Sequence, residues 1–305
     1  MTWLIVAILS YLILAVTFLV DKFLLVSQIP SPKVYAFYVG SASILILLLV
    51  PFVGFSVPTP FQIFLSITAG VFFTCGLFWF YKALHLFEPS RVVPAIGGIL
   101  PIFTFLLVYI SSGGKEIFNL WQFSAFILLV LGSILVTYEK GKILSLKGFY
   151  ISAVAAFLFS LYFVLMKYVF LGQSFWSGLI WIRIGAFLTA ICFFFLFKEI
   201  REEIFRKKEK SKFSIKTTAI FLSNQGAGAG GNFLQSWAVA LAPLVSVAFI
   251  NALQGVQYAF LLVLTIFLSI KFPRILKEEI SKQILVQKIV AILLIGGGLA
   301  ILALK

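Results

Sequence analysis

The chain is a series of long apolar runs separated by short polar breaks. Each run is about 20 residues long, which is the length that an α-helix needs to cross the ~30 Å hydrocarbon core of a bilayer. A helix satisfies its own backbone groups, so it is the form that such runs take in lipid. The runs that we predict as spans are Thr2 to Leu19, Val34 to Phe52, Phe61 to Leu84, Ser90 to Ile110, Trp121 to Tyr138, Gly148 to Phe170, Phe175 to Phe197, Thr217 to Leu241, Leu244 to Ile270 and Ile284 to Leu304.

The overall composition agrees with this pattern. Hydrophobic residues make up 62% of the chain, charged residues make up 11%, and the mean hydropathy is +1.13. A soluble domain carries about 25% charged residues and is unable to keep so much apolar surface away from water. The sequence therefore predicts an all-α, polytopic membrane protein with ten transmembrane helices, located in the cell membrane.

Short segments recur between the two halves of the chain. The sequence around Lys22 reads FLVDKFLL, and the sequence around Lys167 reads FVLMKYVF. Trp121 and Gln122 open a segment that ends VLGSIL, whereas Gln287 opens one that ends IGGGLA. We interpret residues 1–142 and 143–305 as two copies of one five-helix repeat. Because five is odd, the second copy enters the membrane from the opposite face, and the repeats are inverted, as in many transporters.

Basic residues concentrate on one predicted side of the membrane. All but four of the 24 Lys and Arg residues lie in or beside the loops that follow the odd-numbered spans; the exceptions are Lys115, Lys167, Arg183 and Lys305. The positive-inside rule places those loops in the cytoplasm and both termini outside. The net charge of +14 therefore mostly reflects the orientation of the chain in the membrane. Since these residues flank apolar spans, we expect no nucleic-acid partner.

The stretch FWFYKALHLFEPSRVVPAIGGILPIFTFLLVYI, from Phe78 to Ile110, resembles the third and fourth helices of EamA-type members of the drug/metabolite transporter superfamily. Residues 236–264, SWAVALAPLVSVAFINALQGVQYAFLLVL, form a weaker copy in which Gln257 matches Pro101. Arg183 matches an arginine common in this family, whereas Val39 occupies the corresponding position of the first half. The resemblance implies transport of small organic metabolites such as amino acids, and it implies cytoplasmic termini, so the orientation stays open.

Polar and small residues follow one stripe on four of the spans, where they are expected to face a cavity rather than lipid. Amides both donate and accept hydrogen bonds, which suits a neutral or zwitterionic solute. A proline within a span frees a backbone carbonyl one turn earlier. The resulting candidate substrate-binding residues are Thr74, Tyr81, Pro94, Gly98, Pro101, Arg183, Gln225, Asn232, Gln235, Asn251, Gln254 and Gln257. Any one of these amides also fits a purely structural link between helices.

Charged residues near the spans supply candidates for coupling or gating. Asp21 and Lys22 end the first span, Lys167 occupies the place in the sixth span that matches Lys22, and His85 is the single histidine. The two lysines also fit a simpler role, in which their amines reach up to the interface. Arg183 lies about eight residues into its span, roughly 12 Å deep at ~1.5 Å per residue, where a guanidinium needs a partner.

No carboxylate occupies the middle of a predicted span. Proton coupling through a membrane-embedded glutamate is therefore disfavoured. Paired aspartates, clustered metal ligands and a network around His85 are also missing from the pattern, so we predict no enzyme activity, no metal and no cofactor. The partners that we expect are a small-molecule substrate and the lipid bilayer, and a homodimer is left open. The alternative is a membrane scaffold or assembly factor that transports nothing.

Overall fold

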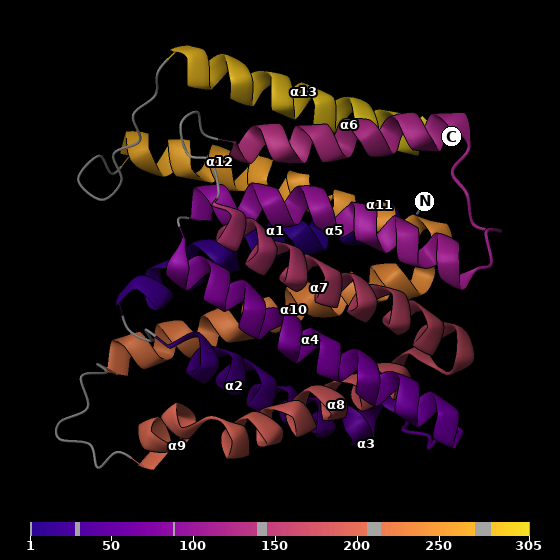
Figure 1. Ribbon diagram of the computed structural model, residues 1–305, viewed down its shortest axis with the longest axis vertical. Helices are drawn as coiled ribbons and strands as arrows, with labels where there is room; N and C mark the ends of the chain where they lie inside the picture. The colour runs from indigo at the N-terminus through magenta and orange to yellow at the C-terminus, as the bar shows by residue number, and fades with distance from the viewer. Residues whose placement is uncertain are drawn as a thin grey trace.

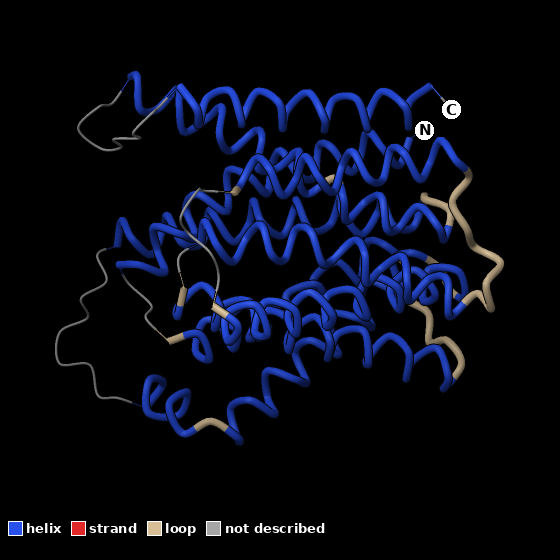
Figure 2. The backbone as a smooth tube through the Cα atoms, turned by 45° about the horizontal axis from the view of Figure 1, so that its top comes forward, coloured by secondary structure: helices blue, strands red, loops and turns tan. Residues whose placement is uncertain are grey.

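The computed structural model describes residues 2–27, 31–87, 89–138, 145–205, 215–271 and 282–304. Within these ranges the regular structure is entirely helical (Figure 2). The helices are α1 (Thr2–Ser27), α2 (Pro32–Ala42), η1 (Ser43–Leu49), α3 (Val50–Val53), α4 (Pro60–Leu86), α5 (Pro89–Ser111), α6 (Leu120–Thr137), α7 (Leu146–Gly172), α8 (Phe175–Leu196), α9 (Lys198–Phe205), α10 (Ile215–Leu241), η2 (Leu244–Ser246), α11 (Val247–Ala252), α12 (Gln254–Lys271) and α13 (Lys282–Leu304).

Six of the described segments are long and apolar enough to cross a bilayer. They are Pro32–Val53, Pro60–Leu86, Leu146–Gly172, Phe175–Leu196, Leu244–Leu261 and Val286–Leu304. Shorter apolar helices cover Thr2–Phe18, Ala95–Ser111 and Leu120–Val136. The fold is therefore that of a multi-pass membrane protein.

The long helices lie side by side in one bundle (Figure 1). α4 packs along both α7 and α8, α1 packs along α10, α6 packs along α13, and α5 packs on α7. The N- and C-termini lie at the same end of the bundle, and α9 lies at the other end (Figure 1). Helices from the beginning and the end of the sequence therefore share one core.

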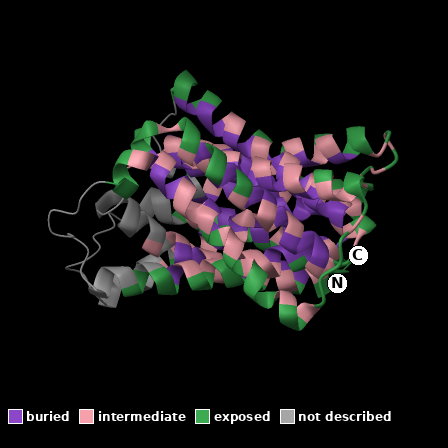
Figure 3. Ribbon diagram, turned by 90° about the horizontal axis from the view of Figure 1, so that it is seen from below, coloured by how far each residue is buried: buried purple, intermediate pink, exposed green. Residues whose placement is uncertain are grey.

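The outer surface of the bundle is apolar. Phe52, Leu146 and Leu304 are each more than four-fifths exposed, and many other large apolar side chains join them on the outside. Burial is confined to the interior, between the helices (Figure 3). A soluble protein rarely exposes so much apolar surface, whereas in a bilayer these side chains contact acyl chains.

The loop between α5 and α6 illustrates how local sequence ends and starts these helices. Gly113 and Gly114 both have positive φ, 65° and 79°, and their amides donate to carbonyls of the last turn of α5. Glycine adopts this conformation without steric cost. Asn119 then caps α6, because its Oδ1 accepts from the Gln122 amide at 2.8 Å while Gln122 Oε1 accepts from the Asn119 amide. This reciprocal pair satisfies two donors that the helix leaves unpaired.

The predicted span from Leu244 to Ile270 is interrupted in the structure. α11 ends at Ala252, and the Val256 amide donates to the Leu253 carbonyl instead of to Ala252. The Ser133 hydroxyl of α6 lies beside the break, 3.2 Å from the Ala252 carbonyl oxygen and 2.7 Å from the Leu129 carbonyl oxygen of its own helix. The break therefore places Gln254 at the first position of a new helix, α12, in the interior of the bundle.

Candidate functional site

A cavity of about 180 Å³ lies in the interior of the bundle. Its described lining comes from α1, α4, α5, α7, α10 and α12. The lining residues are Tyr11, Leu14, Thr17, Phe18, Phe73, Leu77, Phe80, Ile96, Leu100, Phe159, Tyr162, Phe163, Asn232, Gln235, Gln254, Gln257 and Tyr258. On each of the unbroken helices these residues fall in the middle third or close to it, so the cavity lies about midway along the bundle.

Four of the amides predicted to bind substrate line this cavity together. Asn232 and Gln235 lie one turn apart on α10, and Gln254 and Gln257 lie one turn apart on α12. A spacing of three residues places side chains on the same helix face, as the sequence pattern indicated. The structure therefore brings two amide pairs, from separate helices, to one cavity.

The amides differ in the hydrogen bonds that they already make within the protein. Gln257 Nε2 donates across to the Leu14 carbonyl of α1 at 3.2 Å, whereas Asn232 Nδ2 donates to the Gly228 carbonyl of its own helix at 2.9 Å. The Oε1 atom of Gln254 is buried without a hydrogen-bond partner among the described residues. An unpaired buried acceptor costs about 1–3 kcal/mol. Gln254 therefore holds an acceptor that no described residue satisfies.

Aromatic rings make up most of the remaining wall. The centroids of the Phe73 and Tyr162 rings, on α4 and α7, are 5.0 Å apart, and the Phe80 and Phe159 rings meet edge to face at 6.3 Å. Tyr11 is fixed at another edge, since its hydroxyl donates to the Ile250 carbonyl at 2.8 Å. The cavity therefore combines rigid ring faces with amide edges.

Arg183 contacts this wall. Its guanidinium carbon is 5.0 Å from the centroid of the Phe73 ring, and the side chain is partly buried. A guanidinium on an aromatic face gains about 0.5–2 kcal/mol. Phe73 lines the cavity and Arg183 is not among the described lining residues, so the arginine contacts the wall through Phe73.

Four other predicted residues lie at helix contacts outside the described lining. Thr74 donates to the Ala186 carbonyl of α8, and Tyr81 packs edge to face on Tyr35. Gln225 Nε2 donates to the Tyr35 hydroxyl at 3.4 Å, and Asn251 Nδ2 donates to Thr104 Oγ1 at 2.8 Å. These contacts tie neighbouring helices together.

The structure places the remaining candidates as follows. Gly98 and Pro101 are buried on α5, where Gly98 faces Ile134 of α6. His85 is exposed in the last turn of α4. The side chains of Asp21, Lys22 and Pro94 lie outside the described residues.

Lys167 has a structural partner. Only 3% of its surface is exposed, and its Nζ donates at 3.0 Å to the Ala240 carbonyl in the last turn of α10. Carbonyls in a last turn have no partner within their own helix, and a cation there also suits the helix dipole. Lys167 therefore joins α7 to the end of α10 instead of reaching up to the interface.

Replacing Lys167 with methionine is expected to lower the free energy of unfolding by about 1.5–3 kcal/mol, because a charge-assisted hydrogen bond is lost inside the bundle. The thermal midpoint of the purified protein in detergent measures this loss. Lys147→Met removes an exposed lysine at the start of the same helix and is expected to leave the midpoint nearly unchanged. Equal thermal midpoints for both variants would contradict a stabilising role for the hydrogen bond between Lys167 and the Ala240 carbonyl.

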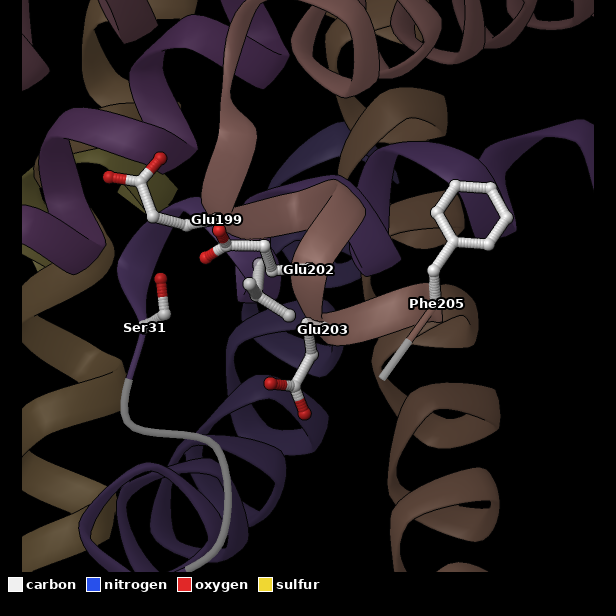
Figure 4. Close-up of a pocket in the computed structure, with 6 residues that line it drawn as sticks. Ser31, Glu199, Glu202, Glu203 and Phe205 are labelled. Atoms are coloured by element: carbon white, nitrogen blue, oxygen red, sulfur yellow. The ribbon is translucent and has the colours of Figure 1, made fainter. Parts of the chain in front are cut away.

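A second cavity, of about 650 Å³, lies at the α9 end of the bundle and shares no residue with the first. It is lined by Ser31, Val34, Glu199, Glu202, Glu203 and Phe205, and Figure 4 shows Glu199 and Glu202 beside Ser31. Lys33 Nζ is 2.6 Å from Glu199 Oε1, and this hydrogen bond holds the pKa of Glu199 below its ordinary value. The described part of this cavity is thus a surface pocket beside an ion pair.

Sequence reasoning missed most of the cavity wall. The missed residues are chiefly apolar or aromatic, and they include Tyr11, Phe73, Tyr162 and Tyr258. Aromatic residues make up 17% of the chain, so an aromatic position on a span carries little information by itself. Tyr11 and Tyr258 reach the same cavity because α1 and α12 pack against each other, and the sequence pattern does not indicate that contact.

Comparison with known proteins gives information about the fold alone. No protein-family model matches the chain, and no curated protein matches it. One solved structure, described only as a crystal structure of a protein, is similar to this chain with a TM-score of 0.66. The match covers 99% of this chain and 96% of that chain at 15% sequence identity. At this identity the likeness establishes that the helical arrangement occurs elsewhere.

Proposed function

We propose that this protein is a secondary transporter that moves small organic metabolites across the cell membrane by alternating access. The observation that carries the proposal is the central cavity, to which both predicted repeats contribute side chains. Transporters built from inverted repeats bind substrate near the midplane, where the repeats meet and where helices are interrupted. The break before Gln254 and the position of the cavity fit that plan.

The packing of the helices supports two repeats of five spans each. The first repeat, 1–142, comprises α1, the continuous segment α2–η1–α3, α4, α5 and α6; the second, 143–305, comprises α7, α8, α10, the segment η2–α11–α12, and α13. Under exchange of the repeats, the α1–α10 contact becomes the α7–α4 contact, and the α6–α13 contact maps onto itself. All three contacts are extensive.

The ends of the chain support the same topology. Ten crossings return the chain to the side where it began, and the two termini lie at one end of the bundle (Figure 1). Lys33, Lys82 and Lys198 lie near the opposite end, as the positive-inside rule requires for cytoplasmic loops. The resemblance of residues 78–110 to EamA-type transporters leads us to propose membership of that family.

Reconstitution tests the proposal directly. Proteoliposomes are loaded with a mixture of unlabelled neutral and zwitterionic metabolites, and entry of each labelled solute is followed by counterflow. We expect at least one solute to exchange several-fold faster than in protein-free liposomes, with saturation at high concentration. If folded protein exchanges none of the solutes, the scaffold alternative is favoured, in which the amide contacts serve packing alone.

A further inference from the structure

The central cavity presents no charged side chain among its described lining residues. Arg183 is not among these lining residues, and its guanidinium carbon is 5.0 Å from the centroid of the Phe73 ring. An ionised carboxylate or ammonium group placed in such a cavity would lose its water without gaining an opposite charge. The lining therefore selects against zwitterions, including the amino acids that the family resemblance suggests.

The polar groups that do line the cavity are suited to a neutral partner. Two amide pairs and the hydroxyls of Tyr162 and Tyr258 offer both donors and acceptors, and the Tyr11 hydroxyl, which donates to the Ile250 carbonyl, offers an acceptor. Gln254 is the strongest candidate among these groups, because its Oε1 acceptor is buried and lacks a partner among the described residues. With its terminal amide turned toward the cavity, Gln254 would accept from an N–H group at the edge of a bound molecule.

The apolar groups favour a flat molecule. Phe73, Phe80 and Phe159 line the cavity together with Tyr162, and their paired rings come from α4 and α7. Aromatic faces stack on planar rings, and they do so with little regard to which heteroatoms the ring carries. The volume of about 180 Å³ lies below the ~300–1,000 Å³ of pockets that hold drug-sized ligands, so the cavity suits a small molecule.

From these three features together, we propose that the cavity binds an uncharged, planar heteroaromatic molecule of one or two rings, with N–H donors and carbonyl or ring-nitrogen acceptors at its edge, as in a free nucleobase. The ring lies among the aromatic side chains, and the edge meets the amides of α10 and α12, with Gln254 Oε1 accepting from a ring N–H. This inference rests on the proposed transport function, under which the bound molecule is the transported substrate. It narrows the class of that substrate.

Equilibrium binding to the purified full-length protein tests the inference. The probes are labelled uracil and adenine, with phenylalanine as a zwitterion that carries an aromatic ring and benzoate as an anion of similar size. We expect saturable binding of at least one nucleobase, with an affinity at least tenfold higher than that for phenylalanine or benzoate. Gln254→Met is expected to weaken nucleobase binding at least fivefold.

A matched control is Gln62→Met at the start of α4. Gln62 Oε1 is also buried without a partner among the described residues, but Gln62 lies outside the cavity, so the same change there is expected to leave nucleobase affinity within twofold of the parent. The inference is overturned if folded protein binds neither nucleobase, if phenylalanine or benzoate binds more tightly, or if Gln62→Met and Gln254→Met have equal effects.

Parallel counterflow measurements separate this inference from the proposed function. Nucleobase binding that depends on Gln254 but is accompanied by no exchange in proteoliposomes supports the inference and contradicts a carrier. Exchange of phenylalanine without nucleobase binding supports a carrier and contradicts the inferred substrate class.

Discussion

Replacing Gly185 with leucine is expected to abolish folded protein, and replacing it with alanine is expected to lower the free energy of unfolding by about 1–3 kcal/mol. Gly185 lies on α8 where that helix crosses α4. A Cβ atom at this position would stand 2.5 Å from the Ile67 carbonyl oxygen. The obstacle is backbone in the middle of a helix, so no side-chain rotation relieves the overlap.

The reciprocal position on α4 reinforces this expectation. A Cβ atom on Gly70 would overlap the backbone of Ile182 and Ala186 on α8. Two glycines thus bring the helices together, and the approach allows Thr74 to donate to the Ala186 carbonyl. Small residues at such crossings allow close packing, which drives helix association in lipid, where the hydrophobic effect between helices is weak.

A glycine in open space supplies the control. A Cβ atom on Gly230 of α10 would have no neighbour within 4 Å among the described residues, so Gly230→Ala is expected to stabilise the helix by up to ~1 kcal/mol through helix propensity. The monodisperse fraction in size-exclusion chromatography and the thermal midpoint in detergent measure both variants. A midpoint for Gly185→Ala at or above that of Gly230→Ala would mean that the α4–α8 contact is not as close as described.

Helix positions could be predicted from the sequence because apolar length is itself the physical requirement for crossing a bilayer. The span predicted from Phe175 to Phe197 differs by one residue from α8, Phe175–Leu196. The span predicted from Leu244 to Ile270 is broken at Leu253, and the Ala252 carbonyl at the break contacts the hydroxyl of Ser133, more than 100 residues earlier in the chain. A contact of that kind leaves no trace in a hydropathy pattern.

The candidate site could be predicted only in part, for a related reason. Amides on α10 and α12 are rare polar groups on apolar helices, and they reach the cavity. Asn251 follows the same three-residue spacing, but the break separates it from Gln254, and it faces Thr104 of α5 instead. Thr74 is a small polar residue at a close helix crossing, which a sequence pattern does not distinguish from a cavity residue.

Removing two cavity amides together, with Asn232→Leu and Gln254→Met, is expected to reduce solute exchange at least tenfold while leaving folded protein intact. Neither change removes a described hydrogen bond between helices, because Asn232 donates within α10 and Gln254 Oε1 has no described partner. Both replacements keep the side-chain size close to that of the parent, so the packing term is small. The polar groups available to a bound solute are what change.

A third amide separates loss of transport from loss of fold. Asn251 is fully buried and donates to Thr104 across two helices, so Asn251→Leu is expected to cost about 1–3 kcal/mol of stability and to reduce the yield of folded protein. Exchange per folded molecule, from counterflow normalised to the monodisperse fraction, is the quantity to compare. If the protein is a carrier, exchange per folded molecule falls in the double variant. If it is a scaffold, the double variant and the parent give the same value. The two amides that line the cavity thus decide between the two proposed classes, because no described hydrogen bond between helices depends on them.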